Sequence, residues 1–217
     1  MKKIVFALIT IFTFIINCQA MERNVTKHYE ITYLHDVPII KEISENKYNS
    51  GNDVLLSNDM VQTEYRKVSV TIIDDLAKLN VVWKQEPRVK SYDILSMYIE
   101  DSGFIIGSIS GTQLASTSSG TKNYSYLAST KNTKLFSNGF GISMNLANAG
   151  NRFTLSMFAK LNDSAKGKKL VASYRHAVRN ISLSTSQKYN LTNGNIKFPT
   201  SSLNLIYDSE LSVDVTV

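Results

Sequence analysis

A period of two runs through most of this 217-residue chain, with apolar and polar residues taking turns along each segment. In residues 68–72 every second side chain is a valine or isoleucine, and residues 79–83 repeat the pattern with Leu, Val and Trp. The polar pair Asp74 and Asp75 lies between these segments, so together they predict a β-hairpin. Turn signals recur at short intervals elsewhere, which favours an all-β sandwich over alternating helices and strands.

The second half of the chain predicts further strands by the same pattern. The candidate strands are residues 92–99, 104–109, 153–161, 203–207 and 211–217. Residues 108–134 are rich in Ser, Thr, Gly and Asn, and they predict flexible loops around a short strand at residues 112–115. Helices are expected to be few and short, and no repeat or change of composition marks a domain linker.

The first twenty residues predict a secretory signal peptide. Lys2 and Lys3 precede an apolar run at residues 4–16, and Ala20 supplies the small residue of a cleavage site. That run would reach about 20 Å as a helix, short of the roughly 30 Å of a bilayer core, so cleavage is favoured over anchoring. Cys18 as a lipoprotein acceptor is the alternative. We therefore predict a signal at residues 1–20, an N-terminal extension at residues 21–36 and one β-sandwich domain at residues 37–217.

Composition limits the chemistry of the mature protein. Cys18 is the only cysteine, so its removal with the signal leaves an exported chain without a disulfide or a thiolate metal site. The formal net charge is +6, but the basic residues are scattered. The one tight basic group, at residues 166–169, is predicted to be a solvated hairpin tip rather than a nucleic-acid patch. Nucleic acid is therefore not expected among the partners.

No catalytic or metal-binding constellation stands out. The three histidines, His28, His35 and His176, have no HxH or HExxH spacing, and the two in the first predicted strand are expected to be exposed. Gly107 and Gly111 have the spacing of a nucleophile elbow, but Ile109 stands where that motif needs serine. The chain is therefore predicted to be neither an enzyme nor the holder of a metal or cofactor.

The segment directly behind the signal is an alternating strand. Its apolar side chains, Val25, Tyr29, Ile31 and Tyr33, share one face, and polar side chains occupy most of the other. Such a strand either pairs within its own sheet or completes the sheet of a neighbouring subunit. A strand passed head to tail makes contacts that do not close, and these build filaments.

Four stretches of the chain resemble a known family in their order. They are residues 22–26 followed by Asp36-Val37-Pro38, residues 65–70 leading to residues 79–83, residues 111–117, and residues 210–215. In these stretches the chain resembles the alpha-class, colonisation-factor-like pilins of the chaperone/usher pathway. A chain that lacks cysteine once mature is consistent with that family. This chain is longer than a typical major pilin of the class and has few glycines near its C-terminus.

The resemblance implies an incomplete immunoglobulin-like β-sandwich that is completed by a donated strand. The implied donor residues are Val25, Tyr29, Ile31 and Tyr33, and the implied acceptor-groove strand carries Leu211, Val213 and Val215. The implied partners are copies of the chain or related pilins, a periplasmic chaperone, an outer-membrane usher and a host-cell receptor. The subunit would cross the periplasm and end in a cell-surface fimbria that supports adhesion.

Two other classes of protein fit the same residues. A secreted or periplasmic β-sandwich binding module would be monomeric and would expose a patch of Tyr or Trp at one edge. Its first strand would pair within its own sheet. A periplasmic chaperone is also an exported sandwich, but it would need two domains and a basic pair in its cleft to anchor a subunit. The placement of the strand behind the signal therefore separates the main hypotheses.

Overall fold

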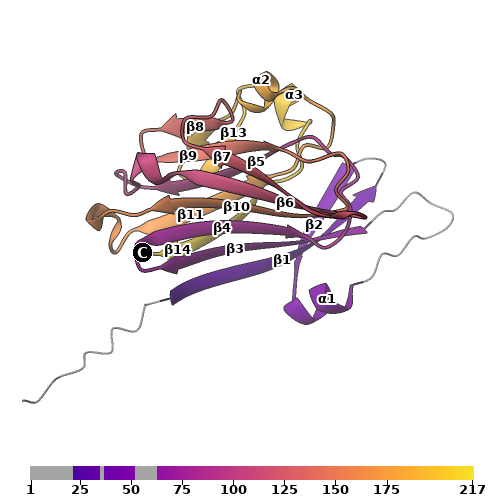
Figure 1. The fold of residues 1–217 in the computed structure, drawn as a ribbon, viewed down its shortest axis with the longest axis horizontal. Helices are drawn as coiled ribbons and strands as arrows, with labels where there is room; N and C mark the ends of the chain where they lie inside the picture. Colours follow the sequence, from indigo (N-terminus) through magenta and orange to yellow (C-terminus); the bar gives the residue numbers. More distant parts are fainter. Residues whose placement is uncertain (1–21, 35–36, 52–62) are drawn as a thin grey trace, which may run out of the picture.

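The computed structural model describes residues 22–34, 37–51 and 63–217, and the predicted signal lies outside this range. Strands dominate the described residues (Figure 1). The helices are short: α1 (Glu45–Ser50), α2 (Leu183–Ser186), α3 (Ser201–Asn204) and the 3-10 turns η1 (Ile106–Ser108) and η2 (Asp163–Ala165). In this part of the chain no helix has the length and apolar character needed to span a membrane.

Two antiparallel sheets face each other and form a sandwich. The first sheet has the strand order β2 (Val37–Ile43), β1 (Glu22–Leu34), β3 (Thr63–Ile73), β4 (Leu76–Trp83), β10 (Arg152–Lys160), β6 (Ser110–Thr117) and β7 (Gly120–Leu127). The second has the order β14 (Leu211–Thr216), β11 (Lys169–Arg175), β5 (Tyr92–Ile99), β9 (Gly139–Asn145) and β8 (Thr133–Phe136). The predicted all-β sandwich is confirmed.

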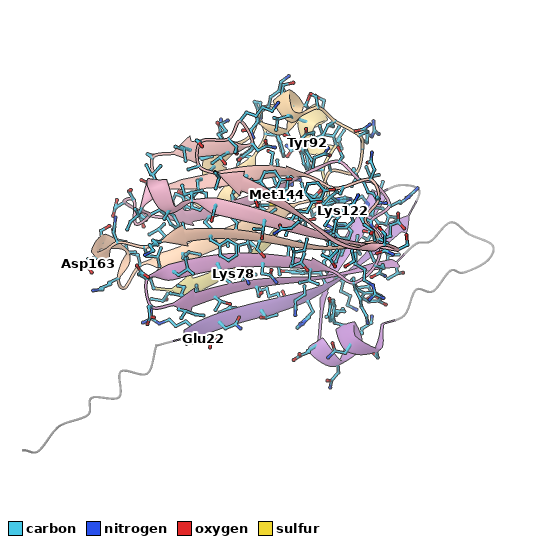
Figure 2. All side chains as sticks on the ribbon, in the orientation of Figure 1. Glu22, Lys78, Tyr92, Lys122, Met144 and Asp163 are labelled. Atoms are coloured by element: carbon cyan, nitrogen blue, oxygen red, sulfur yellow. The ribbon has the colours of Figure 1, made fainter. Side chains whose placement is uncertain are left out.

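The main core lies between the two sheets, where every second side chain points inward. Val68, Val70 and Ile72 of β3 are buried there, as are Leu79 and Val81 of β4. Burying a side chain of this size contributes roughly 1.5–3 kcal/mol. The core is the main source of stability in a domain whose described residues contain no cysteine. Figure 2 draws the side chains of the described residues on the ribbon.

A second, smaller core covers the outer face of the five-stranded sheet. Ile94 of β5 packs there against Tyr189, Ile196, Phe198 and Tyr207. These partners come from the segment that follows β11, which carries α2, α3 and the hairpin of β12 (Asn190–Thr192) and β13 (Asn195–Lys197). The segment lies over the sheet at the α2–α3 end of Figure 1. The second sheet is thus buried on both faces, its inner face by the first sheet and its outer face by this cap.

Several predicted elements agree with the structure. β3 and β4 form the expected hairpin, and Asp74 at its turn has a φ of 53°, a left-handed conformation that aspartate tolerates. The strands predicted at residues 92–99, 153–161 and 211–217 correspond to β5, β10 and β14. The basic residues 166–169 lie in and just after the turn that leads into β11, where Gly167 has a φ of 73°.

Two predicted strands were wrong. Residues 104–109 form an isolated bridge at Phe104 and then the turn η1, and Ile105 and Ile106 stay exposed. Residues 203–207 are not a strand because Thr200 caps α3, its hydroxyl accepting a hydrogen bond from the backbone N–H of Leu203.

The prediction of flexible loops over residues 108–134 was also wrong. This segment forms the hairpin of β6 and β7, with Gly120 at the turn. Most side chains of β7 remain exposed, so its polar composition is compatible with a strand held mainly by backbone hydrogen bonds to β6, with Tyr126 packed against the core. The expected short strand at residues 112–115 lies inside β6.

The strand behind the predicted signal belongs to its own sheet. β1 pairs along its length with β3, and its second half pairs with β2 on the other side. Tyr29, Ile31 and Tyr33 are buried in the main core, and Val25 packs against it partly buried. This is the self-paired arrangement, which differs from donation of the strand to a neighbouring molecule.

Candidate functional site

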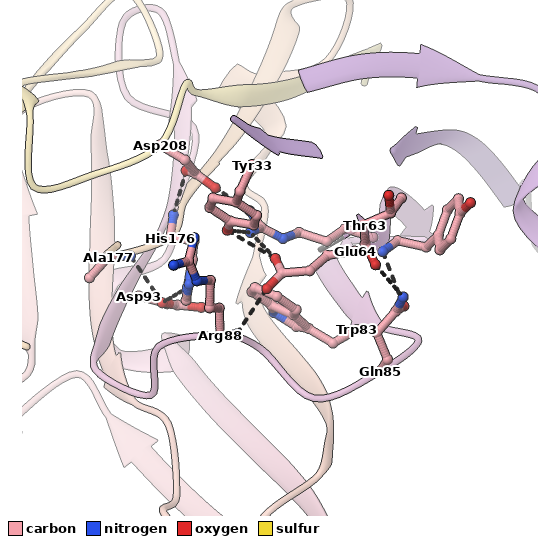
Figure 3. Close-up of polar contacts among 12 residues, drawn as sticks. Tyr33, Thr63, Glu64, Trp83, Gln85, Arg88, Asp93, His176, Ala177 and Asp208 are labelled. Atoms are coloured by element: carbon pink, nitrogen blue, oxygen red, sulfur yellow. Dashed lines mark hydrogen bonds and ion pairs between the residues drawn. The ribbon is translucent and has the colours of Figure 1, made fainter. Parts of the chain in front are cut away.

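Five acidic or basic side chains are buried at one end of the sandwich, in the region shown in Figure 3. We call Glu64, Arg66, Asp93, His176 and Asp208 the buried ion cluster; none is more than 1% exposed. Four of them occupy strand positions or strand ends in phase with the core. Glu64 and Arg66, for example, continue the inward row of β3 that includes Val68. The backbone thus aims them into the interior.

Arg66 is the centre of the cluster. Its guanidinium pairs with Glu64 at 3.0 Å and with Asp208, which reaches it from the segment before β14. It also stacks over Trp83 at 3.9 Å from the ring centroid. Burial acts to lower the pKa of Arg66, but Asp208, Tyr174, Tyr33 and Glu64 together outweigh it, and the pKa lies well above its usual range. The guanidinium therefore links the two sheets as a permanent cation.

Asp93 organises the other half of the cluster. Its carboxylate accepts from His176 Nδ1 at 2.7 Å and from the hydroxyl of Tyr174, and Tyr174 in turn accepts from Trp83 Nε1 at 3.0 Å. Burial and the nearby Asp93 raise the pKa of Tyr174 well above its usual range. His176 packs edge-on against Trp83. Its Nε2 has no hydrogen-bond partner among the described residues.

The cluster joins a surface cleft through Tyr33. The Tyr33 hydroxyl donates to Glu64 at 3.0 Å, and burial raises its pKa above the usual range. Glu64 also accepts from the backbone N–H of Arg88 at 2.8 Å, which ties the loop after β4 to the cluster. Asp208 accepts from the backbone N–H of His176 at 2.9 Å. The buried charges of Glu64 and Asp208 therefore hold the segments around the cleft in place through their backbone N–H groups.

We call the cleft above these loops the basic cleft. It has a volume of about 870 Å³. Its polar walls carry Arg88, Arg175, Arg179, Asn204, Ser209 and the rings of Tyr33 and Tyr207. Its apolar walls carry Val37, Pro38, Val89, Val178 and Leu205. None of these described lining residues is acidic.

Arg175 is held rigidly in the wall of the cleft. Its Nε and one terminal nitrogen donate to the carbonyl oxygen of Asp208 at 2.9 and 2.6 Å, and the other donates to Asn204 Oδ1 at 3.0 Å. Its guanidinium also stacks on Phe198 at 5.3 Å from the centroid. Burial lowers its pKa, but an arginine stays charged at physiological pH. A fixed cation is thus presented to whatever enters the cleft.

The structure brings the residues of the two terminal strands together within one molecule. Leu211, Val213 and Val215 are buried on β14, across the sandwich from β1. The Tyr29 hydroxyl donates to the carbonyl oxygen of Ser212 at 3.4 Å, and Arg23 donates to that of Thr216 at 3.2 Å. The contact expected between a donor strand and a groove strand therefore occurs inside the chain. Intramolecular association favours this arrangement, because it loses no translational entropy.

The predicted exposure of the first-strand histidines was wrong for His28, which is 8% exposed and packs against Tyr48 of α1 at 4.8 Å between centroids. Burial lowers its pKa. His35 lies outside the described residues.

The buried ion cluster and the basic cleft were missed from the sequence. A usable signal exists for part of the cluster: Glu64, Arg66 and Asp93 stand in the core phase of strands whose other in-phase residues are apolar. Charged residues in that phase must either end the strand or find buried partners. Asp208 carries no such signal, because it lies in an irregular segment.

The fold and this site were compared with known proteins. No family model matches the chain, and no curated protein matches its sequence. The collagen-binding domain of a Staphylococcus aureus adhesin superposes with a TM-score of 0.36 at 7% identity, covering 66% of this chain and 89% of that one. The collagen-binding subdomain of the Enterococcus faecalis surface protein ACE gives 0.34 at 10% identity, covering 66% and 88%.

A third solved structure lies in the same range. The KRT10-binding region domain of the pneumococcal serine-rich repeat protein PsrP gives a TM-score of 0.33 at 14% identity, covering 71% of this chain and 87% of that chain. Similarities this distant establish no family. The class that the chain's own geometry defines is a two-sheet β-sandwich with a third, capping layer and a basic cleft at one end.

Proposed function

We propose that this chain is an exported β-sandwich binding module that adheres to a partner through the basic cleft. The observation that carries this proposal is the cleft itself, an open site of about 870 Å³ with three arginines on its walls. Clefts of this size hold small ligands or short segments of a partner. The signal pattern of residues 1–20 supports export, and adhesion is the use we propose for a surface-displayed module of this kind.

We do not propose an enzymatic activity for this module. The pair of His176 and Asp93 has the distance of an acid–base dyad, but both side chains are fully buried. A catalytic base must come within hydrogen-bond reach of its substrate, and no substrate reaches this pair in the folded protein. The pair is better explained as part of the buried ion cluster, which supports the cleft. Neither a cofactor nor a metal enters this proposal.

The fimbrial subunit remains the second candidate function. It is favoured by the contact between β1 and β14, because these are the two strands that donor-strand exchange would pair between molecules. Exchange would require β1 to leave both β2 and β3, which would expose Tyr29, Ile31 and Tyr33. Its partners would be copies of the chain or related pilins, a chaperone and an usher.

Adhesion by the basic cleft can be tested on cells. The purified chain without residues 1–20 is added to epithelial cell layers, and bound protein is measured by immunofluorescence. We expect the double variant Arg88→Glu with Arg179→Glu to lose at least about tenfold in binding, because it reverses two charges on the cleft walls. The matched control is Lys122→Glu with Lys166→Glu, which reverses two charges on β7 and on the turn beside Asp163 (Figure 2). Equal binding by both double variants would contradict the proposal.

Size-exclusion chromatography separates the two candidate functions. The binding module predicts a stable monomer of the intact mature chain in the absence of a chaperone. Donor-strand exchange predicts polymers that grow with time and that a deletion of residues 21–36 abolishes. Polymers of the intact chain, seen as fibres by negative-stain microscopy, would replace the first candidate with the second.

A further inference from the structure

The walls of the basic cleft combine two kinds of chemistry that indicate its ligand. The charged part comes from separate elements: Arg175 ends β11, Arg179 follows it, and Arg88 lies in the loop after β4. The apolar part comes from Val37 at the start of β2 and from Leu205 after α3, which are 61% and 73% exposed. A ligand that satisfies both parts must carry negative charge and aliphatic groups.

Arg175 defines the preferred anion. A guanidinium has five N–H donors, and the hydrogen bonds of Arg175 within the described residues use three of them. One N–H on each terminal nitrogen is left. Two parallel N–H groups match the two oxygens of a carboxylate, and Arg–carboxylate pairs are often bidentate for this reason. Because Asp208 and Asn204 already hold the side chain, little rotamer entropy is lost when an anion binds.

The aromatic residues of the cleft argue against a sugar as the ligand. Saccharide recognition by stacking would need an exposed ring face. Tyr33 is 2% exposed and the Arg88 guanidinium lies over its ring at 5.2 Å, while Tyr207 is 4% exposed and Arg175 lies over it at 6.0 Å. The exposed apolar groups are instead aliphatic, as on surfaces that receive leucine or valine side chains.

We propose that the basic cleft binds an extended acidic peptide segment of a partner protein, with aspartate or glutamate carboxylates on Arg175 and Arg179 and aliphatic side chains against Val37 and Leu205. This inference rests on the proposed function and names its ligand class. The carboxylates fix the orientation of the segment, and burial of its aliphatic groups supplies the area-dependent part of the affinity. An exposed Arg179 also gives the association a dependence on ionic strength.

The proposal is tested with fluorescein-labelled peptides and the mature chain. The probe is an eight-residue peptide of glutamate and leucine, and its fluorescence anisotropy is measured at low and at physiological salt. Two matched peptides replace glutamate by lysine or leucine by serine. We expect the glutamate–leucine peptide to bind, each matched peptide to bind at least tenfold more weakly, and the affinity to fall as salt rises.

Variants locate the binding on the protein. Arg179→Glu and Leu205→Asp change one basic and one apolar surface residue of the cleft, and each is expected to weaken binding of the glutamate–leucine peptide about tenfold or more. Lys122→Glu and Lys166→Glu are the controls and should leave its affinity unchanged. Circular dichroism and thermal unfolding of every variant confirm that it is folded. Equal weakening by the controls would overturn the assignment to this cleft.

Further outcomes separate the ligand class from the function. Absence of peptide binding at about 1 mM, or equal binding of the glutamate and lysine peptides, overturns the peptide proposal. Tighter binding of a sialylated oligosaccharide than of the peptide overturns it as well. If the peptide fails but Arg88→Glu with Arg179→Glu still abolishes cell binding, the ligand class is wrong and the proposed function stands. If the peptide binds as expected but that double variant adheres normally, the cleft is a peptide site and the adhesion proposal fails.

Discussion

The centre of the sandwich and its cleft end are built from the same strands but from different chemistry. At the centre β3 contributes Val68, Val70 and Ile72, while one and two steps earlier in the same inward row it contributes Arg66 and Glu64. The centre is stabilised by burial of apolar surface, and it tolerates modest changes in side-chain shape. The cleft end depends on exact pairing, because a buried charge without a partner is costly. One strand, β3, thus stabilises the core along one half and supports a surface site along the other.

The largest effect is expected when the central cation of the buried ion cluster is removed. We expect Arg66→Met to destabilise the protein by about 3–5 kcal/mol, since Glu64 and Asp208 would remain buried without their shared partner. Urea unfolding followed by tryptophan fluorescence measures the change, and Trp83 lies directly against the guanidinium. A loss of unfolding free energy below about 1 kcal/mol would show that the buried carboxylates do not need Arg66 as a partner.

A second variant shows whether the loss comes from unpaired charge. The triple change Glu64→Gln, Arg66→Met and Asp208→Asn removes the charges together and keeps polar groups for the hydrogen bonds of the loops. Replacing a whole buried ion pair is often nearly neutral. We expect the triple variant to be more stable than Arg66→Met alone, although it has more substitutions. If it is less stable, packing rather than charge dominates at this end.

A truncation in the apolar centre of the sandwich is the counterpart of the Arg66 variant. Leu79→Ala on β4 removes a fully buried side chain that is paired across the sheet with Val70 and Met157, and we expect a loss of about 2–5 kcal/mol. Unlike the loss at Arg66, this one should not change with salt or pH between 5 and 8. A strongly pH-dependent loss would contradict the contrast between the two regions.

Alkaline pH probes the contact between the two terminal strands. Burial raises the pKa of Tyr29 to about 12, so the folded state favours the protonated phenol more than the unfolded state does. Its contribution to stability is complete below pH 10 and is lost as pH rises through about 12. We expect Tyr29→Phe to reduce the steepness of this alkaline loss. An unchanged slope in alkaline urea unfolding would show that Tyr29 does not titrate as part of the folded core.

The smallest effect is expected at Glu210, just before β14. Burial raises its pKa, so the stability it contributes in the protonated form is present below the usual carboxyl pKa and is lost as pH rises through the raised value. Glu210→Gln keeps an acceptor for the backbone N–H of Ile196, which Glu210 binds at 2.9 Å. We expect the variant to gain stability relative to the wild type between pH 4 and 7. A parallel pH dependence for both proteins would contradict this.

The regular strands could be predicted from the sequence because their period is local. The hairpin around Asp74 and the strands β5, β10 and β14 show their inward rows without any knowledge of partners. The wrong predictions concern a strand that has no apolar face and a segment in which a helix cap overrides the alternating pattern. β7 has mainly exposed side chains and was predicted to be loop, and α3 was predicted to be strand because Leu203, Leu205 and Tyr207 alternate.

Leu205 shows why that last pattern was ambiguous. Residues 203 and 207 lie four apart and share the buried side of the α3 turn, while Leu205 between them is 73% exposed. A strand would have placed all three on one face. The deciding interaction is the cap at Thr200, a single side-chain hydrogen bond that periodicity does not weigh.

Local alternation of apolar and polar residues is enough to predict antiparallel strands with one buried face, because side-chain alternation follows from backbone geometry alone. The pairing of β1 and the contacts made at its end depend instead on how distant segments pack in three dimensions. Pairing depends on which edge is nearest in space, and the buried ion cluster and the basic cleft join residues from β1, β3, β5, β11 and the segment before β14. Contacts of such long sequence separation arise from the packing of the two sheets, which no local pattern encodes.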